Sequence, residues 1–192
     1  MKRLVMTNSR LRELLSELDT HAPGEAAHGE RVAVYSVAIG EKLGLTGDRL
    51  DDLRFAAALH DFGKLGLPAD LISSCETLSD REAAELRVHP TWAAELLTDR
   101  GVPPYDGILS HHERWDGTGY PLGLAGEQIP LEGRIIALAE VFDILHYGAP
   151  WQPRKTEVEA IDIIRKESGR QFDPKVAEAF LVVQPLIQPV GT

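Results

Sequence analysis

One stretch organises this chain: His111-His112-Glu113-Arg114-Trp115-Asp116-Gly117-Thr118-Gly119-Tyr120-Pro121. Two adjacent histidines end an apolar segment there, and a glycine-rich loop that carries Gly-Tyr-Pro follows them. A second cluster, His60-Asp61-Phe62-Gly63-Lys64, lies upstream, with His28 and His89 on either side of it. Five of the 7 histidines therefore belong to one ordered set with carboxylates, which is what a hydrolytic metal site needs.

Size and composition place the chain among ordinary globular proteins. Its 192 residues suit one domain with a full hydrophobic core, and 43% of them are hydrophobic and 26% charged. A net charge of −10 argues against a nucleic-acid polymer as partner, although a metal site would supply local positive charge for a small phosphate ligand. Cys75 is the only cysteine, which excludes an intramolecular disulfide and favours a reducing cytoplasm. We find neither a signal sequence nor an apolar run near the roughly 20 residues of a membrane span.

Helical periodicity dominates the sequence and predicts a single-domain, all-α bundle. We expect helices over residues 26–43, 48–60, 91–98, 104–112, 134–146 and 175–183, and loops over 113–133 and 148–155. Two further helices should begin at the capping boxes of Ser79 and Thr156, the second of them ending near Ser168. A leucine stripe predicts an N-terminal helix over residues 1–19, capped by Ser9, ahead of a domain that spans 20–192. That helix would serve dimerisation or packing, and we favour packing.

The adjacent pair His60-Asp61 suits a metal site only where a helix ends. Neighbouring residues on a regular helix diverge by about 100°, so their side chains converge only beyond the last turn. Gly63 makes such an ending plausible, and a carboxylate has two oxygens with which to bridge two cations. The alternative is an ordinary capping or surface pair.

The other candidate ligands are weaker when each is taken alone. Adjacent histidines such as His111 and His112 are usually solvated, but their place between an apolar segment and an unusual loop favours ligands. His28 and His89 are ambiguous on their own. Glu140 lies in a helix in which only it and Asp143 are charged, and a buried charge is costly unless it is paired or bound to metal.

Three more side chains could contact a phosphate or a base. Lys64 follows the first cluster and could hold a phosphate oxygen, although a solvated lysine is the ordinary alternative. Tyr120 and Trp115 offer stacking surfaces for a base, or else anchor their loop to the core.

Together these motifs resemble the HD-GYP family, a branch of the HD-domain metal-dependent phosphohydrolases. The resemblance covers roughly residues 20–183 and rests on residues 28–31, 60–68, 89–90, 111–121 and 172–174. It implies a helical bundle of the HD-domain type that cleaves cyclic dinucleotides, chiefly cyclic di-GMP. The centre in such proteins holds two or three metal ions, usually iron or manganese.

The resemblance also implies roles for particular side chains. The implied metal ligands are His28, His60, Asp61, His89, His111, His112 and Glu140. Asp61 would bridge the two ions, and a metal-bridging hydroxide would attack phosphorus in line. Asp61 and Lys64 would serve catalysis, with Lys64 also contacting the scissile phosphate and Tyr120 lying beside the ligand.

Three departures from the family pattern stand out. Glu140 replaces the usual Asp, and residues 149–152 read Ala-Pro-Trp-Gln where the family has Arg-Pro-Tyr-Arg or Arg-Pro-Tyr-Lys. Both phosphate-binding cations of that loop are absent, and Arg154 is close enough in sequence to substitute. Members with three metals carry Glu where this chain has Gly24, with Glu25 one place off, so we expect two divalent ions, iron or manganese.

The leading hypothesis is a phosphodiesterase that hydrolyses cyclic di-GMP to linear pGpG, with GMP left open as a further product. A second hypothesis is a weakly active or inactive signalling module that binds a GGDEF-domain or other signalling protein. A third is a hydrolase for another nucleotide phosphoester. None of the three involves a nucleic-acid polymer or a membrane.

Overall fold

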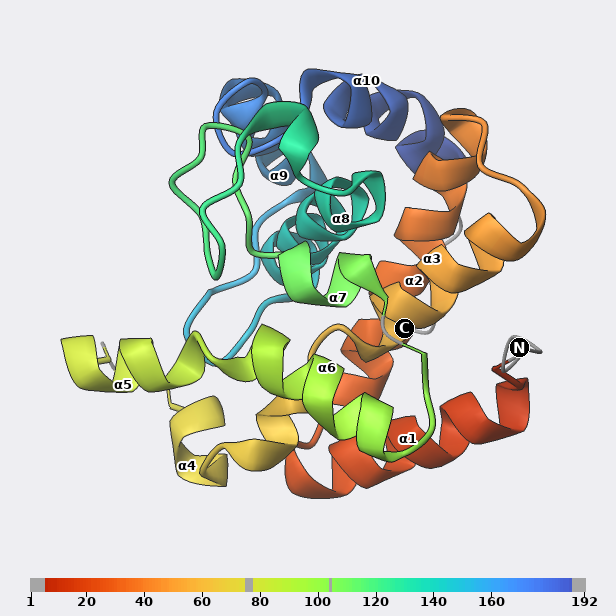
Figure 1. Cartoon of the computed structure of the whole chain (residues 1–192). Helices are drawn as coiled ribbons and strands as arrows, with labels where there is room; N and C mark the ends of the chain where they lie inside the picture. The colour runs from red at the N-terminus through yellow and green to blue at the C-terminus, as the bar shows by residue number, and fades with distance from the viewer. Residues whose placement is uncertain (1–5, 75–77, 104, 188–192) are drawn as a thin grey trace.

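Helices form every regular element in the described part of the chain, which is residues 6–74, 78–103 and 105–187 of a computed structural model (Figure 1). The α-helices are α1 (Asn8–His21), α2 (Glu25–Lys42), α3 (Gly47–Leu59), α4 (Ala69–Ile72), α5 (Asp80–Leu86), α6 (His89–Asp99), α7 (Asp106–Ser110), α8 (Leu131–Tyr147), α9 (Glu157–Glu167) and α10 (Pro174–Val183). Short 3-10 helices are η1 (Phe62–Gly66), η2 (Gly126–Gln128) and η3 (Gln184–Leu186). The predicted all-α bundle is confirmed.

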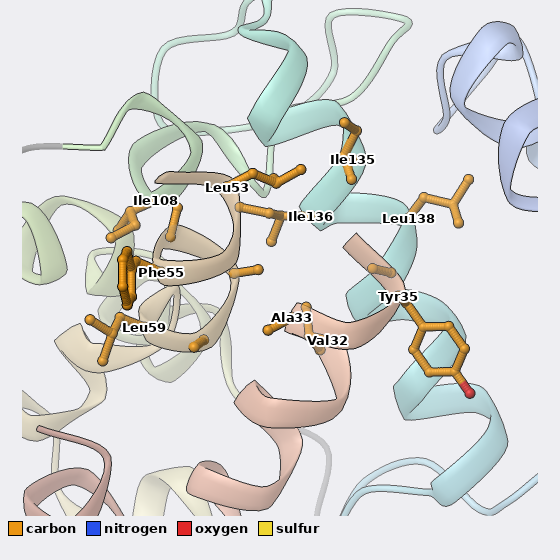
Figure 2. Close-up of a cluster of buried hydrophobic side chains, with 14 of the residues drawn as sticks. Val32, Ala33, Tyr35, Leu53, Phe55, Leu59, Ile108, Ile135, Ile136 and Leu138 are labelled. Atoms are coloured by element: carbon orange, nitrogen blue, oxygen red, sulfur yellow. The ribbon is translucent and has the colours of Figure 1, made fainter. Parts of the chain in front are cut away.

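The hydrophobic core lies where α8 packs beside α2, α3 and α7. Figure 2 shows Val32 of α2, Leu53 and Leu59 of α3, and Ile136 of α8 gathered in one cluster. All four side chains are fully buried. Burying a side chain of this size contributes about 1.5–3 kcal/mol, so this cluster fixes the helices that carry the candidate ligands.

Two glycines allow backbones to approach beside the candidate ligands. A Cβ on Gly29 of α2 would collide with the carbonyl oxygen of Ala58 in α3. A Cβ on Gly63 of η1 would collide with the backbone of His89 in α6. Such contacts need glycine because no side chain fits between the backbones. They bring α2, the end of α3 and the start of α6 to one point.

The N-terminal helix differs from its prediction in both its bounds and its cap. The described helix α1 begins at Asn8 and ends at His21, and residues 1–5 lie outside the described part. Ser9 is not the cap: the Thr7 hydroxyl accepts a hydrogen bond from the Arg10 N–H at 3.2 Å, and Thr7 has the extended backbone of a cap. The predicted leucine stripe is buried, and it consists of Leu11, Leu14, Leu15 and Leu18.

The remaining boundaries follow the local signals with shifts of a few residues. Both capping boxes form, Ser79 with Glu82 and Thr156 with Glu159. Helix α6 begins at His89 rather than at residue 91, and Pro90 lies in its first turn, where its missing N–H costs no hydrogen bond. The loop predicted over 113–133 contains η2, and α8 begins within its last residues. Within the described ranges no helix has the length and apolar character needed to cross a bilayer.

Candidate metal centre and substrate cavity

The side chains of His60 and Asp61 converge because α3 ends just before them, at Leu59. Leu59 is the last residue of α3, His60 caps it, and Asp61 leads into η1. The chain therefore leaves helical geometry at this point, and His60 Nε2 lies 3.1 Å from Asp61 Oδ2. Both residues are buried, which favours the predicted metal site over a surface or capping pair.

Asp61 stands between two groups of histidines. Its Oδ2 lies 3.7 Å from His28 Nε2 and 3.1 Å from His60 Nε2, while its Oδ1 lies 3.2 Å from His89 Nε2. The two oxygens of one carboxylate thus face different histidines. That is the arrangement a carboxylate needs to bridge two cations.

The second group consists of His89, His111 and His112. Helix α7 ends at Ser110, so the adjacent histidines can turn toward one point as His60 and Asp61 do. His89 Nε2 lies 3.2 Å from His111 Nε2 and 3.1 Å from His112 Nε2. Three ring nitrogens at this spacing suit the coordination sphere of one metal ion.

Backbone carbonyls fix which nitrogen of each ring is available. The Nδ1–H groups of His60, His89 and His111 donate to the carbonyls of the residues three positions earlier, at 2.7, 2.7 and 2.6 Å. This tautomer leaves a lone pair on each Nε2, as metal-binding histidines require. Two buried atoms of the cluster, His60 Nε2 and Asp61 Oδ1, have no hydrogen-bond partner. Metal cations fit this donor set.

The pKa values of the cluster follow from burial and from Asp61. Burial alone would lower the pKa of His60, but the Asp61 carboxylate outweighs it and raises that pKa to about 9. Burial lowers the pKa of His89 to about 4 and those of His111 and His112 well below their usual range. Burial would raise the pKa of Asp61, but His60 and Lys64 hold it well below normal. At neutral pH Asp61, His89, His111 and His112 are therefore in their metal-binding forms, whereas His60 carries a second proton that a metal ion would displace from Nε2.

Glu140 and Asp143 of α8 have different surroundings. Glu140 groups with His60 and His111, and its Oε1 lies 3.9 Å from His112 Nε2. Burial raises the pKa of Glu140 to about 8, with the Asp61 charge adding to that effect against the pull of His60. Asp143 instead contacts the far nitrogen of His28 and the guanidinium of Arg31. Glu140 is thus the carboxylate of α8 that faces His60, His111 and His112.

Asp143 orients the first histidine. Its Oδ2 accepts a hydrogen bond from His28 Nδ1 at 2.7 Å, and Arg31 donates to both of its oxygens at 2.6 and 2.8 Å. Burial would raise the pKa of Asp143, but these two partners lower it, so the carboxylate stays ionised. A carboxylate on Nδ1 directs the Nε2 of His28 toward Asp61.

Lys64 lies between two carboxylates. Its Nζ is 2.8 Å from Asp61 Oδ2 and 2.8 Å from Glu25 Oε1. Burial would lower the pKa of Lys64, but Asp61 and Glu25 raise it, so the ammonium stays charged. Glu25 was not among the predicted site residues, although its position three residues before His28 on α2 was a usable signal. Its second oxygen is buried and has no hydrogen-bond partner.

A cavity of about 1160 Å³ opens beside the cluster. Seven predicted site residues line it: His28, Asp61, Lys64, His89, His112, Tyr120 and Glu140. His60 and His111 lie behind this surface and are 0% and 1% exposed. Arg154 lies outside the lining and donates to the His146 carbonyl at 3.2 Å, so its phosphate-binding role stays a prediction.

The Gly-Tyr-Pro loop contributes Tyr120 to the cavity. The Tyr120 ring stacks on His112, with centroids 4.7 Å apart, and the Arg87 guanidinium lies 5.5 Å from its centroid. Buried Glu113 holds the loop by accepting hydrogen bonds from the backbone N–H groups of residues 122, 123 and 124. Trp115 lies outside the cavity lining, with the Arg134 guanidinium 5.8 Å from the centroid of its ring.

Comparison with known proteins places the chain in a family. The model of the HD domain family matches residues 12–176. The chain belongs to the HD domain family. The predicted resemblance to HD-GYP proteins, a branch of the HD-domain family, is therefore confirmed. The phosphohydrolases of the HD domain family depend on metal ions.

Several curated proteins are similar to the chain over most of its length. It is 35% identical to a cyclic di-GMP phosphodiesterase of Thermotoga maritima over 91% of this chain and 47% of that protein. It is 37% identical to the cyclic di-GMP phosphodiesterase response regulator RpfG of Xanthomonas campestris, over 90% and 48%. A 3′3′-cGAMP-specific phosphodiesterase of Vibrio cholerae is 32% identical, over 88% and 33%. The chain thus spans about half or less of the length of these relatives.

Solved structures agree on the fold. A cyclic GMP-AMP specific phosphodiesterase of Vibrio cholerae matches with a TM-score of 0.72 and 27% identity, over 91% of this chain and 48% of that one. The HD domain of the Listeria monocytogenes phosphodiesterase PgpH, solved in complex with cyclic-di-AMP, matches with a TM-score of 0.65 and 18% identity, over 94% and 100%. At that identity the second match supports the fold alone.

Proposed function

We propose that this chain is a metal-dependent phosphodiesterase domain that hydrolyses cyclic di-GMP to linear pGpG, with GMP left open as a further product. The observation that carries the proposal is Asp61, whose two oxygens face two separate groups of histidines on the cavity floor. Similarity to cyclic di-GMP phosphodiesterases over most of the chain supports the substrate class.

Two divalent ions, iron or manganese, are the proposed cofactors. His28, His60 and Asp61 would hold one ion, and His89, His111 and His112 the other, with Glu140 completing the set. Metal ions bound there would polarise the phosphoryl oxygens and activate a water molecule for attack. Nitrogen and carboxylate ligands suit both metals.

The chain's own residues would bind and orient the substrate. Lys64 is charged and lines the cavity, so its ammonium can hold a phosphate oxygen while Asp61 and Glu25 keep it in place. Burial raises the pKa of Tyr120, and the Glu140 charge adds to this, so the phenol keeps its proton and can donate a hydrogen bond. Catalytic roles for Asp61 and Lys64 are part of the proposal.

Cavity size favours a dinucleotide over a smaller phosphoester. Pockets for drug-sized ligands are about 300–1,000 Å³, and this cavity of about 1160 Å³ exceeds that range. The uncharged residues 149–152 favour a second candidate, a weakly active module that binds a GGDEF-domain or other signalling protein. A cytoplasmic location belongs to either proposal and rests on the single cysteine.

The first test is the metal content of anaerobically purified protein, followed by turnover of cyclic di-GMP with Mn²⁺ or Fe²⁺ added. About two ions per chain with pGpG formation is the expected result. Two ions without turnover would favour the signalling module or another phosphoester. Protein that takes up no metal under any loading would rule out both hydrolytic functions.

A further inference from the structure

Residues 149–152 form a hydrogen-bonded turn, three of whose residues line the cavity. The N–H of Ala149 donates to the carbonyl of Gln152 at 2.9 Å, and the N–H of Gln152 donates back to Ala149 at 2.9 Å. Pro150 and Trp151 are therefore the two residues at the tip. The N–H of Lys155 bonds the carbonyl of Leu145 at 2.8 Å and ties the segment to α8. These bonds place the backbone of Trp151 beside the cavity.

Trp151 places a large aromatic surface in the cavity wall. Its residue is 46% exposed, although Trp is usually well buried. Among the exposed large apolar residues of the described chain, only Trp151 lines the cavity. The Lys64 ammonium lies 6.0 Å from the centre of its ring, so the ring reaches toward the candidate metal centre.

The turn over residues 149–152 presents the aromatic ring of Trp151 to the cavity and carries no charged side chain. Ala149 and Pro150 line the cavity beside Trp151, and neither can pair with a phosphate. The Gln152 side chain donates to the carbonyl of Pro153 at 3.0 Å and is committed within the turn. The turn therefore offers a phosphate no cation, whereas the flat face of a nucleobase matches the exposed indole.

We propose that Trp151 is a stacking platform for one purine base of a cyclic dinucleotide bound in the cavity. The inference rests on the proposed function for its ligand class. Stacking supplies affinity that the uncharged turn cannot supply through phosphate contacts. Because every base has a π-face, this platform does not distinguish guanine from adenine, and selectivity must come from elsewhere in the cavity.

The test compares the variants Trp151→Ala, Trp151→Leu and Trp151→Phe with wild type in metal-loaded protein. We expect Trp151→Ala to raise the KM for cyclic di-GMP about 5- to 150-fold while kcat stays within about twofold, since stacking is lost equally from ground and transition states. The KM of Trp151→Phe should lie close to that of wild type, and the KM of Trp151→Leu close to that of Trp151→Ala.

The KM of Trp151→Ala for 3′3′-cGAMP should rise by the same factor as its KM for cyclic di-GMP. Val158→Ala removes another exposed apolar side chain, outside the cavity, and is the matched control.

Tryptophan fluorescence provides a readout that a purely structural role would not change. Cyclic di-GMP should quench the emission of wild type, and Trp151→Phe should lose most of the quenching although Trp92 and Trp115 remain. Equal KM values in wild type and Trp151→Ala, or a fall in kcat alone, would overturn the proposal.

Failure of the hydrolytic function can be told apart from failure of the platform. If wild type turns over no cyclic dinucleotide, calorimetric Kd values for cyclic di-GMP replace KM. Weakening of at least about fivefold in Trp151→Ala would then support the platform without the phosphodiesterase. Unchanged Kd values, or no binding by wild type, would refute it.

Discussion

The candidate metal ligands form the floor of the cavity, and the turn over residues 149–152 forms its rim. These two regions hold their side chains in different ways. On the floor, four of the histidine ligands are held by a hydrogen bond from the far ring nitrogen, as His28 is by Asp143 and His89 is by the Leu86 carbonyl. At the rim, the turn over residues 149–152 is uncharged and presents an exposed Trp151. The floor depends on charge and on orientation in a buried site, and the rim on the surface it offers to a ligand. Substitutions on the floor should therefore act on metal and reaction together, and those at the rim on substrate affinity.

The largest expected effect comes from Asp61→Ala, which removes the carboxylate between the two histidine groups. Bound metal should fall from about two ions to one or none, and kcat/KM by about 10³-fold or more, because several kcal/mol of charge stabilisation is lost. Elemental analysis and a turnover assay on one sample measure both. Asp162→Ala changes an exposed carboxylate on α9 and should alter neither. Unchanged metal content in the Asp61 variant would contradict the bridging role.

Asp143→Asn tests whether orientation on the floor matters as well as charge. The variant keeps the shape of the side chain but loses the ionised partner of His28 and Arg31. Substitutions of such supporting groups cost about 10- to 100-fold in metal affinity, and we expect that loss here. Competitive titration with a chelator measures it, at a temperature where both proteins are folded. Metal affinity equal to that of an Asp162→Asn control would show that His28 needs no orienting carboxylate.

Acid should destabilise the metal-free protein through His89, His111 and His112, because burial lowers the pKa values of these histidines. The pKa of His89 is about 4 in the folded chain against 6.5 normally, and those of His111 and His112 shift the same way. The stability from these neutral rings is present above pH 6.5 and is lost as the pH falls toward 4. For His89 alone the loss is on the order of 2 kcal/mol by pH 5. The raised pKa values of Glu140 and His60 act in the opposite direction, because their contributions grow as the pH falls toward the unfolded values of 4.5 and 6.5, so the effect of His89 is isolated by comparing variants.

Denaturant unfolding of chelator-treated protein between pH 7 and pH 5 measures this loss. His89→Gln should show a shallower slope of unfolding free energy against pH. A slope equal in both proteins would mean that His89 does not titrate differently in the folded and unfolded chains.

The smallest expected effect is at the rim, where Gln152→Arg restores one cation to the turn. An exposed contact of this kind contributes up to about 1 kcal/mol, so the Kd for cyclic di-GMP should fall by at most about fivefold. The gain should shrink at high salt, because exposed charges are screened. Val182→Arg adds the same charge on α10, outside the cavity lining, and is the control. Tighter binding in both variants alike would show only an effect of net charge.

Local signals in the sequence predicted the helices well, because caps and glycines act over a few residues. Gly44, with φ of 86°, ends α2 where expected, and the capping boxes of Ser79 and Thr156 form. The prediction that Ser9 caps α1 was wrong because Thr7 and Ser9 are both good capping residues and lie two positions apart. Only the backbone conformation distinguishes them.

The candidate ligands could also be named from the sequence, but their partners could not. Adjacent histidines and a carboxylate among apolar residues are visible in one dimension. The ion pair of Glu25 with Lys64 joins residues on α2 and η1, and its 2.8 Å contact depends on how those elements pack. Trp115 was a predicted stacking residue and lies outside the cavity lining, whereas Trp151, which no sequence motif singled out for stacking, lines the cavity.

The sequence by itself determined the helical class, the helix end at which His60-Asp61 leaves regular geometry, and the HD-domain resemblance, whereas the helix predicted through His112 ends at Ser110. Each depends on short-range propensity or on residue types at fixed spacing. Only the tertiary structure decided that Asp61 faces both histidine groups, that Asp143 supports His28 while Glu140 faces the cluster, and that Trp151 stands in the cavity wall. Those relations join α2, α3, α6, α7 and α8, and they exist only once the buried core has fixed how these helices cross.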